Sequence, residues 1–218
     1  MVAIVGFGSL LSEASARSTF GDGVRNFRLA TVLDYRRVFA HPASIFFQRG
    51  IADLETKEIA SLSTEPAPGC KFLVSVFDIP EELLPDFYER EEEFKIISAT
   101  FQELDGSARG EALMCTRWSD DEYIAKRGQG TFDTKYKAYG LNTIWGVERR
   151  QRHPSVSGVP SSLSASSQEA WTGADVYDDF VTTTYLGDRS TTIKEYVEAK
   201  PSIMLERPPL HLVDRYSG

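Results

Sequence analysis

The first half of the chain alternates short runs of β-branched and aromatic residues with turn-forming residues, a pattern that predicts strands. The first such run covers residues 2–5 and stops at two glycines and a serine. Further strands are predicted over residues 28–40, 45–53, 58–63, 71–77, 95–104 and 109–118, with a turn at residues 65–69. We therefore expect a β-rich first half.

A helix is predicted from about residue 79. Asp78 and Glu81 have the spacing of a capping box, and Pro80 suits the first turn of a helix. At about 100° per residue, Glu91 falls near the centre of an apolar arc. The arc consists of Leu83, Leu84, Phe87 and Tyr88. A carboxylate on the buried side of a helix loses solvation, which raises its pKa and suits it to act as a general base. In the alternative, the helix ends before residue 90 and Glu91 lies in water.

The neighbouring carboxylates Glu89, Glu92 and Glu93 project away from that arc, so we expect them to form a solvated face. Because three glutamates follow one another, the position of the catalytic carboxylate is open among Glu91, Glu92 and Glu93. The choice of Glu91 among these three depends on the preceding Arg90.

The second half of the chain predicts helices. Ser119 and Glu122 have capping-box spacing, and Gly128 ends that short helix. Residues 131–152 are expected to be mostly helical, and residues 169–185 and 190–199 form two later helices. Thr192 and Glu195 suggest a second capping box. Between these parts, the serine-rich stretch 153–168 has little to bury and is expected to be a loop.

We therefore divide the chain into a domain over residues 1–152, a serine-rich loop over 153–168, and a helical extension over 169–218 that packs on the same domain. The composition, with 41% hydrophobic and 26% charged residues, supplies one substantial core. A net charge of −8 argues against a nucleic-acid partner. No stretch is long and apolar enough for a membrane span, and no signal peptide is evident, so a cytoplasmic location is expected.

Cysteine and histidine usage predicts neither disulfides nor a metal site. Cys70 and Cys115 lie far apart without framework spacing, which favours reduced thiols. His41, His153 and His211 are scattered and have no partner at ligand spacing, so we interpret all three as structural or surface residues.

The turn after the first strand, Gly6-Phe7-Gly8-Ser9-Leu10, can hold an anion on its backbone N–H groups, because glycine lets a ligand approach the main chain. The dinucleotide fingerprint is excluded, since its third glycine would stand at Leu11. A phosphate-binding P-loop is excluded too, since no Gly-Lys-Ser/Thr ending follows. The remaining alternative is a simple tight turn.

Together, Phe7-Gly8-Ser9-Leu10 and Glu91 resemble the γ-glutamylcyclotransferase family, which has an aromatic-Gly-Ser-Leu turn after the first strand and one essential glutamate mid-chain. The stretch Tyr88-Glu89-Arg90-Glu91-Glu92-Glu93-Phe94 is similar to the ChaC-type arrangement, in which the glutamate follows an arginine. The resemblance covers about residues 1 to 117. Two glutamates stand where relatives commonly have small residues, and the last third matches no family pattern.

The resemblance implies an α+β fold, a small mixed β-barrel with flanking helices and extra C-terminal helices. It implies a cofactor-free reaction in which the α-amine of a γ-glutamyl group attacks its own side-chain carbonyl and releases 5-oxoproline. Glu91 would move the proton, and Phe7, Gly8, Ser9 and Leu10 would bind the substrate's α-carboxylate. The partner is then a small γ-glutamyl molecule of undetermined leaving group, and no oligomeric state is implied.

Two alternatives stay open. One is a lyase for γ-glutamyl amines or another acylated small molecule. The other is a non-catalytic small-molecule-binding or interaction module on the same fold, which predicts that Glu91 is exposed or out of reach of the turn.

Overall fold

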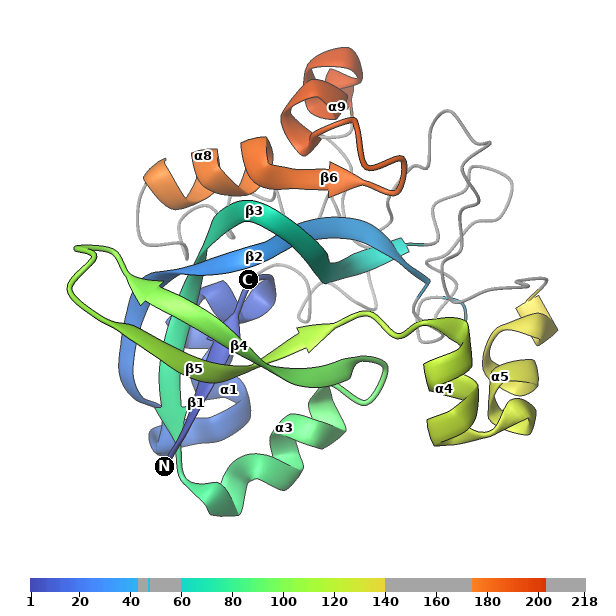
Figure 1. The fold of residues 1–218 in the computed structure, drawn as a ribbon, viewed down its shortest axis with the longest axis horizontal. Coiled ribbons are helices and arrows are strands. Elements are labelled where there is room, and N and C mark those ends of the chain that lie inside the picture. Colours follow the sequence, from blue (N-terminus) through green and yellow to red (C-terminus); the bar gives the residue numbers. More distant parts are fainter. Residues whose placement is uncertain (43–46, 48–59, 140–173, 203–218) are drawn as a thin grey trace.

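Five strands close a mixed β-barrel in a computed structural model of the chain, which describes residues 1–42, 47, 60–139 and 174–202 (Figure 1). The strands are β1 (Val2–Gly6), β2 (Arg25–Pro42), β3 (Ala60–Ile79), β4 (Lys95–Glu103) and β5 (Arg109–Thr116). They follow the order β3-β1-β5-β4-β2, and β2 pairs with β3 to complete the circle. All neighbours are antiparallel except β1 and β5, which run parallel. The predicted α+β class with a small mixed barrel is confirmed.

Strands β2 and β3 form the longest pair of the barrel, and they overturn the predicted turn at residues 65–69. Strand β3 runs through this segment, with Tyr35 opposite Pro66. The register shifts between Leu33 and Tyr35, where the N–H of Gly69 donates to Asp34 Oδ1 at 2.9 Å. Gly69 has φ +80°, a conformation that glycine adopts at little cost. The Pro- and Gly-rich sequence therefore makes an irregularity within a continuous ribbon and not a chain reversal.

The barrel interior is filled by side chains of all five strands together with residues of the flanking helices. The largest fully buried members include Ile4, Phe72, Phe77, Ile79, Phe87 and Met114. This apolar core fixes the barrel, because each buried aliphatic or aromatic side chain contributes about 1.5–3 kcal/mol relative to exposure.

Helices lie around the barrel and confirm two of the predicted capping boxes. They are α1 (Glu13–Phe20), α3 (Leu84–Arg90), α4 (Asp120–Arg127), α5 (Gln129–Lys135), α8 (Ala174–Thr183) and α9 (Ile193–Ala199). Ser119 and Glu122 cap α4, which ends at Gly128, and Thr192 and Glu195 cap α9. The helix predicted over residues 169–185 is wrong at its end, because Thr184–Leu186 form strand β6, which pairs parallel with β2.

The C-terminal elements α8, β6 and α9 lie against the long β2–β3 ribbon (Figure 1). Arg37 of β2 is fully buried there, between the rings of Phe72 and Phe180 at 4.9 and 4.7 Å, and pairs with Asp179 of α8. Burial lowers the pKa of Arg37 to about 10, although the charge and the hydrogen bond of Asp179 oppose that shift. An ion pair that packs between two aromatic rings thus holds these elements against the barrel.

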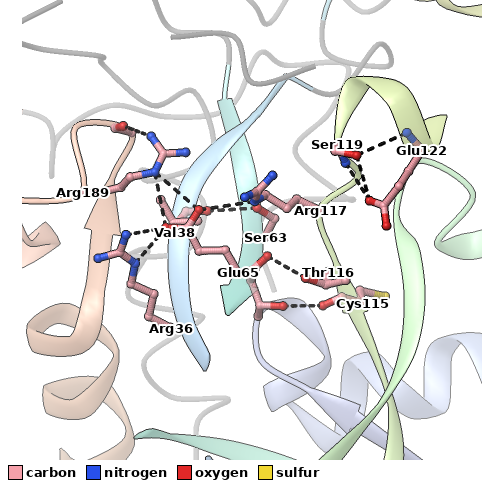
Figure 2. A network of polar contacts seen from close by, with 12 residues as sticks. Arg36, Val38, Ser63, Glu65, Cys115, Thr116, Arg117, Ser119, Glu122 and Arg189 are labelled. Atoms are coloured by element: carbon pink, nitrogen blue, oxygen red, sulfur yellow. Dashed lines mark hydrogen bonds and ion pairs between the residues drawn. The ribbon is translucent and has the colours of Figure 1, made fainter. Parts of the chain in front are cut away.

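A second ionic cluster surrounds Glu65 of β3 (Figure 2). Arg36 Nε donates to its carboxylate at 2.8 Å, and Arg117 and Arg189 approach it within 3.4 Å. Glu65 is 4% exposed. Next to it, Thr64 Oγ1 donates to the carbonyl of Cys115 at 2.7 Å, which ties the end of β5 to β3.

Some predictions fall outside the described residues. These are the strand over 45–53 apart from Phe47, which is helical, the second part of the helical segment 131–152, the serine-rich stretch 153–168, and two of the histidines. Within the described part, no helix combines the length and apolarity needed to cross a membrane.

Candidate functional site

The glycine turn (residues 6–10) begins at the last residue of β1 and is held by hydrogen bonds from β3. Ser75 Oγ donates to the carbonyl of Leu10 at 2.6 Å and contacts the carbonyl of Gly6 at 3.4 Å. A side chain at Gly6 would place its Cβ 2.5 Å from the Leu10 oxygen, so this position requires glycine. Gly8 then precedes a single 3-10 turn, Ser9–Leu11.

The segment before Glu91 differs from the predicted helix at both ends. Asp78 belongs to β3 and accepts from Asn26 Nδ2 at 2.7 Å, so the expected capping box does not form. A 3-10 turn, Glu81–Leu83, comes first, and α3 begins only at Leu84. The apolar arc also ends early, since Phe87 is fully buried and Tyr88 is 50% exposed.

Glu91 is the residue that ends α3, and its N–H donates to the Phe87 carbonyl at 3.1 Å. The helix therefore ends at Arg90 and not before residue 90, and the Glu91 side chain is only 15% exposed, so the alternative that placed Glu91 in water is wrong. Burial raises the pKa of Glu91, and the charge of Arg90 and hydrogen bonds from Cys115 and Arg90 oppose the shift without cancelling it. The environment is that of a carboxylate with a raised pKa, which suits it to take and return a proton.

Cys115 supports Glu91 from the barrel wall. This residue lies near the end of β5, is 4% exposed and forms no disulfide. Burial and the neighbouring charge of Glu91 raise the pKa of the thiol well above its ordinary value of 9.0. The thiol is therefore neutral and donates to the carboxylate.

Arg90 joins Glu91 to the glycine turn. Its Nε donates to Glu91 Oε1 at 3.0 Å, and its Nη2 donates to Ser9 Oγ at 2.9 Å. A third bond, from Nη1, reaches Thr19 Oγ1 of α1 at 2.6 Å. The two sequence features separated by more than eighty residues are thus connected through one guanidinium.

The parallel pairing of β1 and β5 explains this meeting. Ile4 is opposite Leu113, so two residues further along each strand Gly6 and Cys115 reach the same end of the barrel. The turn after β1 and the Cys115 thiol that contacts Glu91 are therefore neighbours in the fold, although the two strands are far apart in the sequence.

Glu92 and Glu93 have other partners, so the expectation of a common solvated face is wrong for Glu93. Lys135 of α5 lies 3.5 Å from a carboxylate oxygen of each. Glu93 is 12% exposed and accepts from Tyr136 at 3.2 Å, whereas Glu92 is 61% exposed. These contacts tie the α4–α5 pair to the turn between α3 and β4 and leave Glu91 as the member of the run that is linked to the glycine turn through Arg90.

The buried His41 packs against Phe94, with ring centroids 4.9 Å apart. Burial lowers the pKa of His41 to about 4, and the charge of Glu93 opposes the shift, so the ring is neutral near pH 7. Within the described ranges, no group of three His, Cys, Asp or Glu side chains is placed to hold a metal ion.

Sequence reasoning singled out the turn and Glu91 but not Thr19, which accepts a hydrogen bond from Arg90, or Cys115, which contacts Glu91. Thr19 sits in a helix that no pattern predicted, and Cys115 stood in a strand as an ordinary apolar residue. Neither has a sequence signal, because each contributes through a contact between distant segments.

Comparison with known proteins gives similarity at the level of structure. No protein-family model matches the sequence, and no curated protein matches it. An uncharacterized protein from Homo sapiens aligns with a TM-score of 0.43 and 13% identity, over 65% of this chain and 88% of that chain. A structure named γ-glutamyl cyclotransferase aligns with a TM-score of 0.41 and 11% identity, over the same shares. An AIG2-like protein from Mus musculus aligns with a TM-score of 0.37 and 12% identity, over 70% and 92%.

These structures include the family that the sequence motifs resemble.

Proposed function

We propose that the protein is a γ-glutamylcyclotransferase that releases 5-oxoproline from a γ-glutamyl peptide or amine, with Glu91 as general base and acid. The observation that carries the proposal is the link from Glu91 through Arg90 to Ser9, which brings a buried carboxylate to the glycine turn. The family resemblance of the two motifs supplies the substrate class.

The reaction needs few groups. The α-amine nitrogen of the substrate attacks its own γ-carbonyl carbon, the lactam C–N bond forms, and the C–N bond to the leaving amine breaks. Glu91 accepts a proton from the attacking nitrogen and returns one to the leaving nitrogen, so no redox change occurs. Orientation supplies much of the rate in an intramolecular attack, and one carboxylate with a raised pKa can serve as base and then as acid.

The glycine turn is assigned to the substrate's α-carboxylate. Main-chain N–H groups of Phe7, Gly8, Ser9 and Leu10 and the Ser9 hydroxyl are the donors we assign to it. Ser75 fixes the turn from the barrel side, so the donors are held in place before a ligand arrives.

A non-catalytic binding module is the rival function, and it predicts an exposed Glu91 distant from the turn. A 15% exposed side chain that shares Arg90 with Ser9 favours the catalytic assignment.

The test is to incubate the metal-free protein with glutathione, γ-glutamyl amino acids and γ-glutamyl amines, and to follow 5-oxoproline by mass spectrometry. Release that is lost in Glu91→Gln and kept in Glu89→Gln, an exposed neighbour on α3, would support the reaction and its base. The preferred member of the panel would identify the leaving group. If none of the substrates releases 5-oxoproline, the result favours the non-catalytic binding module.

A further inference from the structure

Arg90 makes hydrogen bonds to three separate elements of the chain. Its guanidinium donates to Glu91 at the end of α3, to Ser9 in the glycine turn and to Thr19 in α1, at 3.0, 2.9 and 2.6 Å. In the part of the chain that the structure describes, it is the side chain with hydrogen bonds to both Ser9 and Glu91. Removing it would disconnect the proposed base from the proposed binding turn.

We propose that Arg90 is the positioning residue of this site: it holds the Glu91 carboxylate and supplies the positive charge that selects substrates with a free α-carboxylate at the glycine turn. The proposal rests on the proposed function for the identity of the substrate. It goes further in naming the residue that sets specificity, and it predicts that a γ-glutamyl compound with an amidated α-carboxyl group is rejected.

The geometry suits this double role. A guanidinium carries five N–H donors in one plane, and three of them are used here. The side chain is 26% exposed, so a ligand at the turn can reach its remaining donors. Contacts between a guanidinium and a carboxylate are charge-assisted and about twice as strong as neutral hydrogen bonds.

The balance of charge at Glu91 depends on few groups. Arg90, on the same segment, and the Cys115 thiol of β5 both favour the charged form of Glu91 against burial. The nearby cations of the α4–α5 pair have other partners, since Lys135 pairs with Glu92 and Glu93 and Arg127 donates to the Glu92 carbonyl at 3.1 Å. A substrate carboxylate that binds Arg90 would therefore weaken the effect of Arg90 on Glu91. The pKa of Glu91 would rise, so Glu91 would be a stronger base when the amine must be deprotonated.

The first experiment compares Arg90→Gln and Arg90→Lys with the wild type across pH. We expect Arg90→Gln to lower kcat/KM at least tenfold, because a charge-assisted contact is lost on both sides. The acidic limb of the pH profile should move to higher pH, since a group that lowers the pKa of Glu91 has gone. Lysine keeps the charge without the planar fork, so Arg90→Lys should restore the position of the limb more than the affinity.

A matched control is Arg17→Gln on α1, whose guanidinium pairs with Glu13 at 2.7 Å on the exposed face of that helix. It should leave kcat/KM and the pH profile unchanged. An Arg90→Gln protein that folds like the wild type and keeps both quantities would overturn the proposal.

The second experiment needs no turnover. Glutaric acid monoamide has the carboxylate and the amide of a γ-glutamyl group but no α-amine, and glutaramide is its uncharged counterpart. By calorimetry, the wild type should bind the monoamide at least tenfold more tightly than the diamide, and Arg90→Gln should lose this preference.

Equal binding of both probes by the wild type, no binding of the monoamide, or an unchanged preference in Arg90→Gln would each contradict the role of Arg90. A preference that depends on Arg90 in a protein that releases no 5-oxoproline would support the role and reject the proposed reaction. The two failures are therefore distinguishable.

Discussion

Glu65 and Glu91 are both buried glutamates in contact with arginine, but they lie in opposite environments. Three guanidiniums, from Arg36, Arg117 and Arg189, surround the carboxylate of Glu65, and the side chain is 5% exposed (Figure 2). Glu91 has one guanidinium and a neutral thiol as partners and is 15% exposed.

The difference concerns what each carboxylate is able to do. A carboxylate enclosed by several cations joins the segments that supply those cations, here β2, the residue after β5 and the turn after β6. Glu91 has too few partners to offset its burial, so its pKa is raised and a proton can be exchanged. We infer that Glu65 stabilises the structure and that Glu91 is available for chemistry.

The largest expected effect is on turnover in Glu91→Gln. Removing a general base that also acts as an acid should lower kcat by about 100-fold or more. Stability should not fall, because the raised pKa means that the charged carboxylate costs folding free energy at pH 7, above the unfolded value of 4.5. That cost is absent below the unfolded pKa, grows as the pH rises from the unfolded to the folded pKa, and is fully present above the folded one. Assays of 5-oxoproline release and thermal unfolding at pH 7 check both parts.

A marked loss of stability in Glu91→Gln would mean that Glu91, like Glu65, is a structural carboxylate. The proposed difference in role between the two glutamates would then be wrong.

Glu65→Gln should show the reverse behaviour. Three guanidiniums would lose their shared carboxylate, and breaking a buried ion pair costs about 3–5 kcal/mol. Since the arginine side chains are 26–29% exposed, we expect a smaller loss of unfolding free energy, roughly 2–3 kcal/mol. Urea titration measures it, and kcat of the folded protein should be kept.

Glu103→Gln is the matched control for Glu65→Gln. Glu103 pairs with Arg28 at 3.0 Å, but both side chains are part-exposed, at 24% and 36%. Such a pair contributes about 0–1 kcal/mol. Equal losses in the two variants would show that enclosure by three arginines adds nothing.

The sequence predicted the components of the site better than the contacts among them. The strand before the glycine turn, the two later capping boxes and the burial of Glu91 followed from local pattern, because caps and turns depend on nearby residues. The reason for the burial differed, however. The helical wheel predicted it from a helix that in fact ends at Arg90, and Glu91 is covered instead by contacts with β5 and Arg90.

Contacts between distant segments left no trace in the local pattern. Glu65 stood in a predicted turn, although it is paired in a ribbon with β2 and held by an arginine from the C-terminal part. Glu93 was expected in solvent and instead contacts Lys135 and Tyr136. Such positions are decided by tertiary packing, which periodicity and capping signals do not contain.

The glycine turn offers a smaller test of the Glu91 side of the comparison. In Gly6→Ala the new Cβ would lie 2.5 Å from the Leu10 carbonyl oxygen, and backbone can relieve this only by moving the turn. Overpacking of this kind costs about 1–3 kcal/mol, and substrate affinity should fall with it. Among the described residues, the new Cβ of Gly8→Ala meets Leu62 Cδ2 alone, at 3.3 Å, and this variant should be milder.

Gly130→Ala in α5 is the control for both glycine variants, because no atom of the described residues lies within 4 Å of its Cβ position. Alanine in a helix should leave stability unchanged or raise it by up to about 1 kcal/mol. Gly6→Ala with the wild-type KM and unfolding free energy would show that the turn is not held as tightly as its contacts indicate.

The smallest expected effect comes from Cys115, and it isolates the hydrogen bond beneath Glu91. Cys115→Ala removes the thiol donor, so the pKa of Glu91 should rise further and the acidic limb should move to higher pH. Because a thiol is a weak donor, its hydrogen bond to the carboxylate should contribute about 0.5–1.5 kcal/mol, so kcat/KM on that limb should fall roughly two- to tenfold. Cys115→Ser keeps a donor of similar size and should hold the limb near its wild-type position. If alanine and serine shift the limb equally, the effect comes from packing of the sulfur, and the pKa of Glu91 is then set by burial, which raises it, and by Arg90, which lowers it.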